Sequence, residues 1–350
     1  MNKRVLMVAY PLLPVSEASA GGAEQILWTL ERELKRRGWE TEVAACAGSQ
    51  VAGKLVATGE APQGQDAFGA REREHTQHII EACIENQYSI VLDHSGHLFR
   101  HAARVNALVL ATLHLPRELY GPEMFEGLTE NVYFNCVSQS QRASFTDIPQ
   151  LLGVVRNGID LTRFKIGGRK KDYLLWLGRV CPEKAPHLAV AAAKKAGLPI
   201  VLAGQVYPFA WHNQYWESKV APLIDGQQVR FVELPTFTEK TKLLREARAL
   251  LVPSLIGETT SLVSLEAMAS GTPVIGFQGG ALSQVVPKGT GFLVLDVDEM
   301  AAACAAVSEI RAADCRQWVE REFSSITMGD EYETMITDLV EQKRWQFRRR

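Results

Sequence analysis

Short apolar runs alternate with longer amphipathic stretches along most of the chain. The runs have the length of β-strands, and the stretches repeat apolar residues at helical spacing, as Ile26, Leu30 and Leu34 do before Gly38. Strand–helix–strand order brings neighbouring strands together in parallel through right-handed crossovers. The alternation therefore predicts doubly wound α/β sheets, whose ligands bind at the carboxyl ends of the strands.

The predicted elements fall into two similar series. In the first half we expect strands at residues 4–9, 41–45, 89–93, 107–113 and 132–137, with helices at 22–37 and 70–86. In the second half we expect strands at 173–177, 199–203, 229–234, 249–252, 273–277 and 292–294. Helices of the second half are expected at 184–196, 239–247, 261–270, 298–310 and 314–322.

Residues 148–168 separate the two series, because Pro149 and several glycines interrupt any regular element there. We predict one domain over residues 1–150 and a second over 151–325. A C-terminal helix and basic tail, 326–350, are expected to pack back on the first domain. The fold class is then α/β, with two doubly wound Rossmann-like domains facing a cleft, and that cleft is the expected ligand site.

Charge and composition exclude several classes of protein. The formal net charge of −2 gives no global positive field for nucleic acid, so no nucleic-acid partner is expected. No apolar run approaches the roughly 20 residues of a membrane helix. The six cysteines form no C-x-x-C pair, which favours reduced, buried thiols and a cytoplasmic location. A secretion signal is disfavoured because Pro11 and Pro14 interrupt the first apolar stretch.

A glycine pair, Gly21-Gly22, precedes Ala23-Glu24 where the first helix begins. Two glycines let the backbone approach a ligand closely, and a helix start offers free N–H groups to an anion. A tight loop without a ligand is the alternative. The G-x-G-x-x-G fingerprint does not follow the first strand, which counts against a nicotinamide dehydrogenase.

A second loop, Gly178-Arg179 to Lys184, leads from a predicted strand into a predicted helix. Arg179 supplies a planar fork for phosphate oxygens and Lys184 supplies a point charge. Both can face one diphosphate across such a loop. The alternative is two ordinary surface charges beside a helix start.

The most informative stretch runs from Glu258 to Pro273. The predicted helix begins near Ser261, so the N–H groups of Ser261, Leu262 and Val263 suit a phosphate. Glu258, in the preceding loop, and Glu266, inside the helix, can accept hydrogen bonds from sugar hydroxyls. An amphipathic helix with two ordinary glutamates is the alternative.

Taken together, these segments resemble the retaining glycosyltransferases of family 4, which have the GT-B fold. The resemblance rests on the glycine loop at 21–24, the linker at 155–160, Gly178-Arg179 to Lys184, and the E-x7-E pair followed by Ala-x-Ala-x-Gly-Thr-Pro. In such enzymes the second domain binds a nucleotide sugar and the first binds the acceptor. The resemblance covers nearly the whole chain.

The resemblance implies a role for each matching residue. Arg179 and Lys184 match the basic pair that holds the donor diphosphate, and Gly22 matches a loop glycine beside the phosphates. Glu258 matches the glutamate that contacts the donor sugar, and Glu266 the one that holds the ribose. Thr259-Thr260-Ser261 replaces the usual Gly-Phe-Gly, which leaves the donor sugar open.

His114 matches a histidine of the acceptor domain near the reacting carbon of the sugar. A loop histidine bonded to the backbone is the alternative. Implied catalytic residues are thus His114, Arg179, Lys184 and Glu258, and implied donor-binding residues are Gly22, Arg179, Lys184, Glu258, Ser261, Leu262, Val263 and Glu266.

The implied activity is transfer of a hexosyl group, from a UDP-sugar in preference to others, to an unidentified acceptor hydroxyl with retention. No metal and no cofactor are expected, since the nucleotide sugar is a substrate. Arginine, lysine and a helix start would neutralise the leaving diphosphate. Two alternatives remain: a nucleotide-sugar epimerase on the same fold, and a non-catalytic nucleotide-sugar binder.

Three further features have weaker interpretations. Asp296-Val297-Asp298 spells a D-x-D metal motif, but Asp298 is expected to cap a helix instead. His94 and His97 follow a predicted strand and could cap a helix or contact an acceptor. The basic tail, 343–350, could touch anionic lipid weakly, with a solvated terminus as the alternative.

Overall fold

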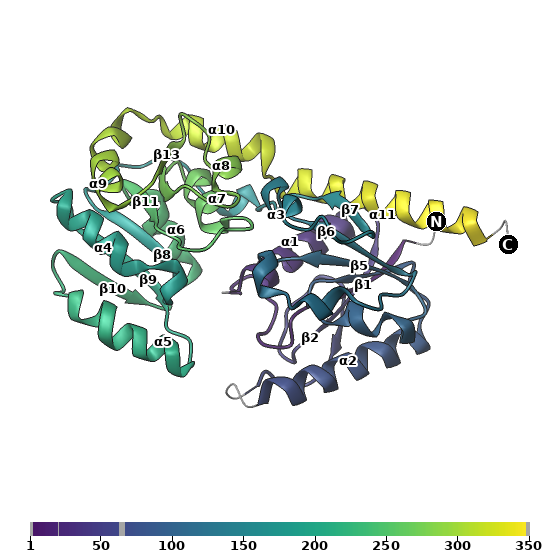
Figure 1. Ribbon diagram of the computed structural model, residues 1–350. Helices are drawn as coiled ribbons and strands as arrows, with labels where there is room; N and C mark the ends of the chain where they lie inside the picture. The colour runs from purple at the N-terminus through teal and green to yellow at the C-terminus, as the bar shows by residue number, and fades with distance from the viewer. Residues whose placement is uncertain (1–2, 20, 63–66, 348–350) are drawn as a thin grey trace. The chain divides into compact units, whose positions relative to one another are not determined.

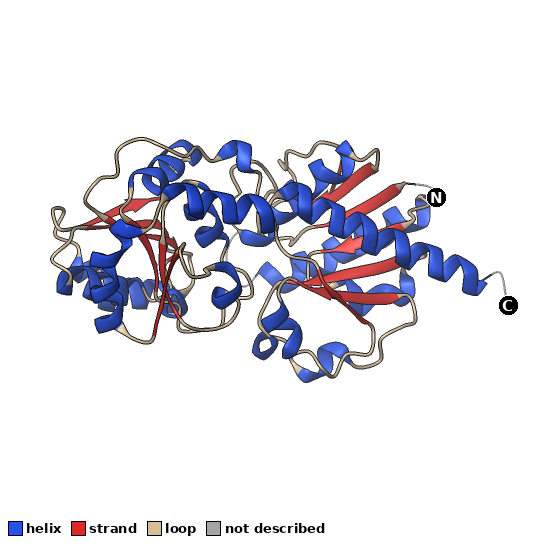
Figure 2. Cartoon of the chain, turned by 90° about the horizontal axis from the view of Figure 1, so that it is seen from above, coloured by secondary structure: helices blue, strands red, loops and turns tan. Residues whose placement is uncertain are grey.

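The computed structural model describes residues 3–19, 21–62 and 67–347. The chain divides into two compact units (Figure 1). Unit 1 comprises Met1–Gly158 and Ser325–Arg350, and unit 2 comprises Ile159–Ser324. Figure 2 shows that helices cover the strands in both units.

Unit 1 contains a seven-stranded parallel sheet in the order β3-β2-β1-β4-β5-β6-β7. Its strands are β1 (Arg4–Val8), β2 (Glu40–Ala45), β3 (Lys54–Ala57), β4 (Ile90–Asp93), β5 (Leu108–Leu113), β6 (Val132–Cys136) and β7 (Leu151–Val154). The central strands are buried on both faces, which explains their continuous apolar runs. The strand order reverses between β1 and β4, which makes their carboxyl ends the switch point of this sheet.

The helices of unit 1 are α1 (Gly22–Arg36), α2 (Phe68–Glu85), α3 (Gln139–Ala143) and α11 (Ser325–Phe347). Short 3-10 turns occupy Leu98–Arg104, Arg117–Leu119 and Pro122–Phe125. Helix α11, yellow in Figure 1, returns to unit 1 after the whole of unit 2. The guanidinium of Arg37, just after α1, donates a hydrogen bond to the carboxylate of Asp330 on α11 at 2.7 Å. The hydroxyl of Ser325 donates to the carboxylate of Glu33 at 2.8 Å.

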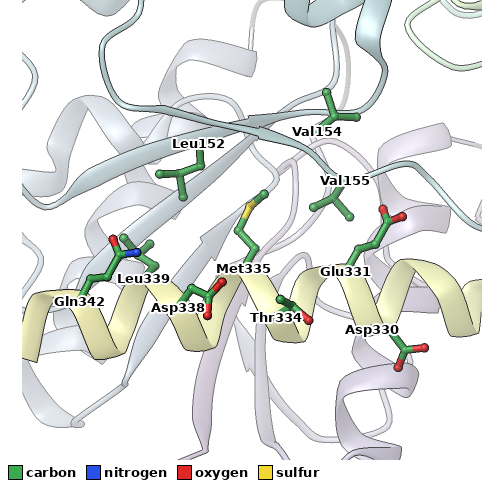
Figure 3. Close-up of a pocket in the computed structure, with 10 residues that line it drawn as sticks. All are labelled: Leu152, Val154, Val155, Asp330, Glu331, Thr334, Met335, Asp338, Leu339 and Gln342. Atoms are coloured by element: carbon green, nitrogen blue, oxygen red, sulfur yellow. The ribbon is translucent and has the colours of Figure 1, made fainter.

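Helix α11 also reaches the core of unit 1. Tyr332 is fully buried, and its hydroxyl lies 2.9 Å from that of Thr112 on β5. Farther along the helix, Met335 faces the edge strand β7 across a groove of about 510 Å³ (Figure 3). The helix therefore belongs structurally to the domain that the chain left at Gly158.

Unit 2 contains a six-stranded parallel sheet in the order β10-β9-β8-β11-β12-β13. Its strands are β8 (Leu174–Arg179), β9 (Ile200–Gln205), β10 (Val229–Glu233), β11 (Ala249–Val252), β12 (Val274–Phe277) and β13 (Gly291–Val294). The order reverses between β8 and β11, so their carboxyl ends form the switch point of unit 2.

The α-helices of unit 2 are α4 (Pro186–Lys195), α5 (Ala210–Tyr215), α6 (Phe237–Glu246), α7 (Leu262–Ala269), α8 (Leu282–Val285), α9 (Val297–Ala306) and α10 (Ala312–Glu322). A π-helical turn at Trp216–Val220 continues α5, and 3-10 turns occupy Leu161–Arg163, Pro182–Lys184, Ala221–Leu223 and Val307–Glu309. Two apolar clusters fill the faces of the sheet, one centred on Leu175 and Leu250 and the other on Leu174 and Leu251.

The predicted fold class of two doubly wound α/β domains is confirmed. The structure differs from the sequence analysis at the edges. Strands β3 and β7 were not expected, because each is short and only partly buried. Since β7 pairs with β6, residues 151–158 lie in unit 1, although the predicted second domain began at 151.

Helix α4 begins at Pro186 and not at Lys184 as expected. Ala185 adopts a left-handed backbone conformation, with φ 45°, which separates the preceding 3-10 turn from the helix.

All six cysteines are buried and unpaired. Among the described residues, no helix combines the length and the apolar character needed to cross a membrane.

Candidate functional site

Three of the predicted residues lie at the carboxyl ends of β8 and β11 or in the loops that follow these strands. Arg179 is the last residue of β8, Lys184 ends the 3-10 turn that follows, and Glu258 lies in the loop after β11. The Nζ atom of Lys184 donates to Oε1 of Glu258 at 2.6 Å. An ion pair thus joins two loops that are 74 residues apart in the sequence.

The Glu258 carboxylate has a fixed position. Its Oε1 also accepts a hydrogen bond from the Ser254 hydroxyl at 2.5 Å, and its side chain is 9% exposed. Its backbone carbonyl accepts from the amide of Ala281 at 2.7 Å. Gly280 packs on this backbone with φ 51°, where a Cβ atom would lie 2.4 Å from the Glu258 carbonyl oxygen. Two contacts of the side chain and two of the backbone therefore hold the loop.

Helix α7 begins beside this loop, with Ser261 as its N-cap. The predicted helix began near Ser261, and the structure places the first helical residue one position later, at Leu262. The Ser261 hydroxyl lies 2.8 Å from that of Ser264. The first-turn N–H groups, including those of Leu262 and Val263, have no acceptor within the helix, so this end carries a partial positive charge.

Glu266 lies in the second turn of α7 and is almost fully buried. Its Oε1 accepts a hydrogen bond from Nζ of Lys240 on α6 at 2.7 Å, and the two side chains are 5% and 16% exposed. The Lys240 ammonium also lies 5.2 Å from the ring centre of Phe237. Glu266 is therefore compensated by a lysine of the preceding helix, which the sequence analysis did not identify.

Arg179 is exposed, and its guanidinium carbon lies 5.7 Å from the ring centre of Tyr207. Tyr207 belongs to an aromatic segment that runs from the loop after β9 into the start of α5 and also contains Phe209, Trp211 and His212. Burial and the charge of Arg179 lower the pKa of His212. The loop after β9 thus adds aromatic surface beside the arginine.

Gly22 and His114 belong to unit 1, whereas the other predicted residues belong to unit 2. Gly22 is the exposed first residue of α1. Glu24, two positions later, is buried, and burial raises the pKa of its carboxyl. A Cβ atom on Gly21 would lie 2.0 Å from that carboxyl, so a larger residue here would displace the Glu24 side chain.

His114 directly follows β5 and lies against His94, which directly follows β4. The Nε2 atom of His114 is 2.9 Å from Nδ1 of His94, so one imidazole donates and the other accepts. The Nε2 atom of His94 is buried and has no hydrogen-bond partner among the described residues. Burial lowers the pKa of His114 to about 4 and that of His94 well below its ordinary value. Both rings are therefore neutral near pH 7.

Asp296, and not Asp298, is the N-cap of α9. Its carboxylate accepts hydrogen bonds from the amides of Asp298 and Glu299, each at 2.9 Å. Asp298 instead pairs with Lys195. The expectation that Asp298 caps the helix is thus wrong, because the side chain before the first turn is the one that reaches the free amides.

Residues 171–309 match the model of a family described as "Glycosyl transferases group 1". The match encloses every predicted residue of unit 2, from Arg179 to Glu266. The D-inositol 3-phosphate glycosyltransferase of Mycolicibacterium paratuberculosis is 34% identical over 175 residues, which cover 45% of this chain and 40% of that protein. The match therefore spans well under half of the length of this relative.

Two solved structures show the fold over nearly the whole chain. The sucrose-phosphate synthase of Thermosynechococcus elongatus superposes with a TM-score of 0.82 at 18% identity, covering 97% of this chain and 100% of that one. HepE of Anabaena in complex with UDP-glucose gives 0.75 at 15% identity, covering 96% and 99%. The fold is GT-B.

Lys240 was missed by the sequence analysis, although its position in α6 indicates a buried ion pair. It lies one helical turn before Leu244, which is fully buried, so it shares the buried face of α6. A lysine on such a face requires a carboxylate partner, and Glu266 stands on the next helix of the glycosyltransferase-like segment. The pairing of His94 with His114 joins the ends of two strands and is not encoded in the spacing of the two residues.

Loss of the Lys240 ammonium leaves the buried Glu266 carboxylate without its partner. Lys240→Met should therefore lower the free energy of unfolding by about 3 kcal/mol, as for other broken buried ion pairs. Adding Glu266→Gln should recover part of this loss, because the uncompensated charge is removed. Urea unfolding of both variants measures the effect, with the exposed Lys242→Met as the control. Equal stability of Lys240→Met and Lys242→Met would contradict the coupling.

Acid should destabilise unit 1 through its buried histidines. The pKa of His75 and of His114 is lowered to about 4, and that of His94 is also lowered. The unfolded chain therefore binds more protons than the folded one between about pH 6.5 and 4. The stabilisation is complete above pH 6.5 and declines as the pH falls through this window.

His114→Gln should reduce this slope by up to about 1.4 kcal/mol per pH unit, which corresponds to one proton. Urea unfolding at pH 5, 6 and 8 measures it, with pH 8 as the reference at which the histidines are neutral. A variant whose slope matches that of the wild type would contradict the neutral pair.

Proposed function

We propose that this chain is a retaining glycosyltransferase that moves a hexosyl group from a UDP-sugar to an acceptor hydroxyl. One observation carries the proposal: the segment that matches the glycosyltransferase family contains Arg179, Lys184, Glu258 and Glu266, and Lys184 pairs with Glu258 at the switch point of unit 2, where Arg179 ends β8. The choice of UDP is supported by HepE, whose structure was solved with UDP-glucose. Under this proposal unit 1 binds the acceptor.

The leaving diphosphate would gain negative charge as the bond to the sugar breaks. Arg179 and Lys184 supply two cations at the carboxyl end of β8, and the start of α7 adds oriented amides. Such preorganised charges lower the barrier because they need no rearrangement when the negative charge develops. Lys184 is 30% exposed, so a phosphate can approach its ammonium while Glu258 keeps its bond to Ser254.

The two glutamates would bind different parts of the donor. Glu258 stands in the loop at the start of α7 and would accept hydrogen bonds from sugar hydroxyls. Glu266 lies deeper and would meet the ribose with the help of Lys240, which fixes its carboxylate. The hydroxyls of Thr259, Thr260 and Ser261 would line the sugar pocket in place of a bulky ring.

Retention is proposed without a covalent enzyme intermediate. Glu258 is occupied as an acceptor from Lys184 and Ser254, which makes it a poor nucleophile. The acceptor oxygen would attack on the face from which the diphosphate departs, and a phosphate oxygen would take the acceptor proton. His114, held by His94, would bind near the reacting carbon as a neutral imidazole.

The proposal includes no metal and no cofactor, since side chains and a helix end neutralise the diphosphate and the nucleotide sugar is a substrate. It also assigns the protein to the cytoplasm, where reduced cysteines are stable. The proposed lipid contact of the basic tail, 343–350, concerns side chains outside the described part of the chain.

Removal of either phosphate-binding cation should slow transfer strongly. Arg179→Ala and Lys184→Ala should each reduce kcat/KM by on the order of 10²–10³, because stabilisation of the leaving group is lost. Release of UDP from UDP-glucose, UDP-galactose and UDP-N-acetylglucosamine with a panel of hydroxyl acceptors provides the assay. NMR of the anomeric proton in the product tests retention.

Arg230→Ala, an exposed arginine on β10, is the matched control and should retain wild-type turnover. Circular dichroism should show that all three variants are folded. Undiminished turnover of the Arg179 and Lys184 variants would remove the diphosphate assignment, and inverted products would remove the retaining mechanism.

Transfer should also survive removal of divalent metal. With excess EDTA, kcat/KM should remain within about twofold of its untreated value, because Arg179, Lys184 and the α7 amides carry the charge stabilisation that a metal would otherwise provide. Loss of activity in EDTA with recovery in Mg²⁺ or Mn²⁺ would overturn the metal-independent mechanism.

A further inference from the structure

A second pocket in unit 2 lies at the amino ends of the strands, away from the proposed donor residues. It encloses about 760 Å³ and is formed by the segments that enter β8, β11 and β12, together with the connection from α9 to α10. The lining residues that matter here are Arg169, Lys170, Lys171, Asp172, Arg248 and Ala312. The volume is within the range of small-molecule sites.

Four cations and one carboxylate line this pocket. Arg248 donates to Asp172 at 2.8 Å, and Lys171 pairs with Glu246 at 2.7 Å, so these two cations are compensated. Arg169 and Lys170 have no carboxylate within ion-pair distance among the residues that the structure describes. The pocket therefore carries an excess of positive charge.

Lys170 is held in a geometry that leaves its charge uncompensated. Its Nζ atom donates to the carbonyl of Arg245 at 3.0 Å and to the hydroxyl of Thr272. Both acceptors are neutral, and burial lowers the pKa of Lys170 to about 8. A desolvated ammonium without a carboxylate gains more from an incoming anion than an exposed surface lysine does.

The start of a helix adds to the positive charge of the pocket. Ala312, which lines the pocket, is the first residue of the 11-residue helix α10, whose first-turn amides lie at the positive end of the helix dipole. Gly271 adjoins it with φ 74°, and a Cβ atom there would lie 2.9 Å from that of Ala312. The missing side chain keeps this wall of the pocket close to the helix.

We propose that this pocket binds a small phosphorylated metabolite, with its phosphate group between Arg169 and Lys170. A phosphate dianion matches two uncompensated cations, and the guanidinium fork of Arg169 suits its oxygens. The remaining volume accommodates the organic part. This site goes beyond the proposed transferase activity and does not depend on it.

The site is separate from the proposed donor residues. Arg169 and Lys170 precede β8, whereas Arg179 ends it, and the six residues of this strand span roughly 17–20 Å. A ligand here would therefore not displace a donor directly. Its binding can be measured without any transfer reaction.

The test uses a chain in which the proposed donor site cannot bind phosphate. In the Arg179→Ala/Lys184→Ala double variant, calorimetric titration at constant ionic strength with glucose 6-phosphate should show saturable binding in the millimolar range or tighter. Inorganic phosphate should compete for the same site, whereas glucose should not bind. Absence of saturable binding of glucose 6-phosphate up to 20 mM would overturn the proposal.

Two substitutions then locate the site. Adding Arg169→Gln or Lys170→Met should weaken binding at least tenfold, whereas Lys165→Met, an exposed lysine outside the pocket, should leave it unchanged. Arg169 is exposed, so its variant tests the site even where Lys170→Met disturbs folding. Equal affinity in the Arg169→Gln and Lys165→Met variants would overturn the assignment. Binding of inorganic phosphate alone, without glucose 6-phosphate, would likewise refute a metabolite pocket.

Discussion

Burial of parallel strands on both faces is the constraint on which the rest of the structure depends. A strand such as β11, whose four residues are all buried, has no room for a charged side chain. The cations of both proposed sites in unit 2 therefore lie at strand ends or in the adjoining loops. In unit 2 the carboxyl edge carries Arg179, Lys184 and Glu258, and the amino edge carries Arg169 and Lys170. The same constraint that builds the core thus separates two sets of charges.

The two glutamates of the E-x7-E stretch illustrate how spacing and environment combine. Glu258 meets a lysine from the loop after β8, while Glu266 meets a lysine from the helix after β10. Both carboxylates are largely buried, yet the partner of Glu258 is more exposed than that of Glu266. A ligand can therefore compete for Lys184 more easily than for Lys240, which agrees with the proposed roles of Lys184 as a diphosphate contact and of Lys240 as a support for Glu266.

In unit 1 the sequence predicted the central strands of the sheet better than its edge strands. Central strands such as β5 and β11 lie within a residue of the expected ranges, because continuous apolar runs report burial on both faces. Strands β3 and β7 were missed because edge strands bury less and need fewer apolar residues. Glu258 lies in the loop after β11, as predicted, whereas Arg179 ends β8 instead of lying in the loop that follows it. The Lys240–Glu266 and His94–His114 pairs depend on packing between elements that spacing does not encode.

Unit 2 is inserted into unit 1, since the chain leaves at Gly158 and returns at Ser325. The two segments that connect the units lie side by side: the backbone N–H of Ile159 donates to the carbonyl of Phe323 at 2.9 Å. During synthesis the seven strands of unit 1 emerge long before α11, whose Tyr332 fills the space beside Thr112. The core of unit 1 therefore lacks the Tyr332 side chain until unit 2 and α11 have been synthesised. Folding of unit 2 brings Ile159 and Ser324 close together. This lowers the entropy cost of packing α11 against the sheet of unit 1.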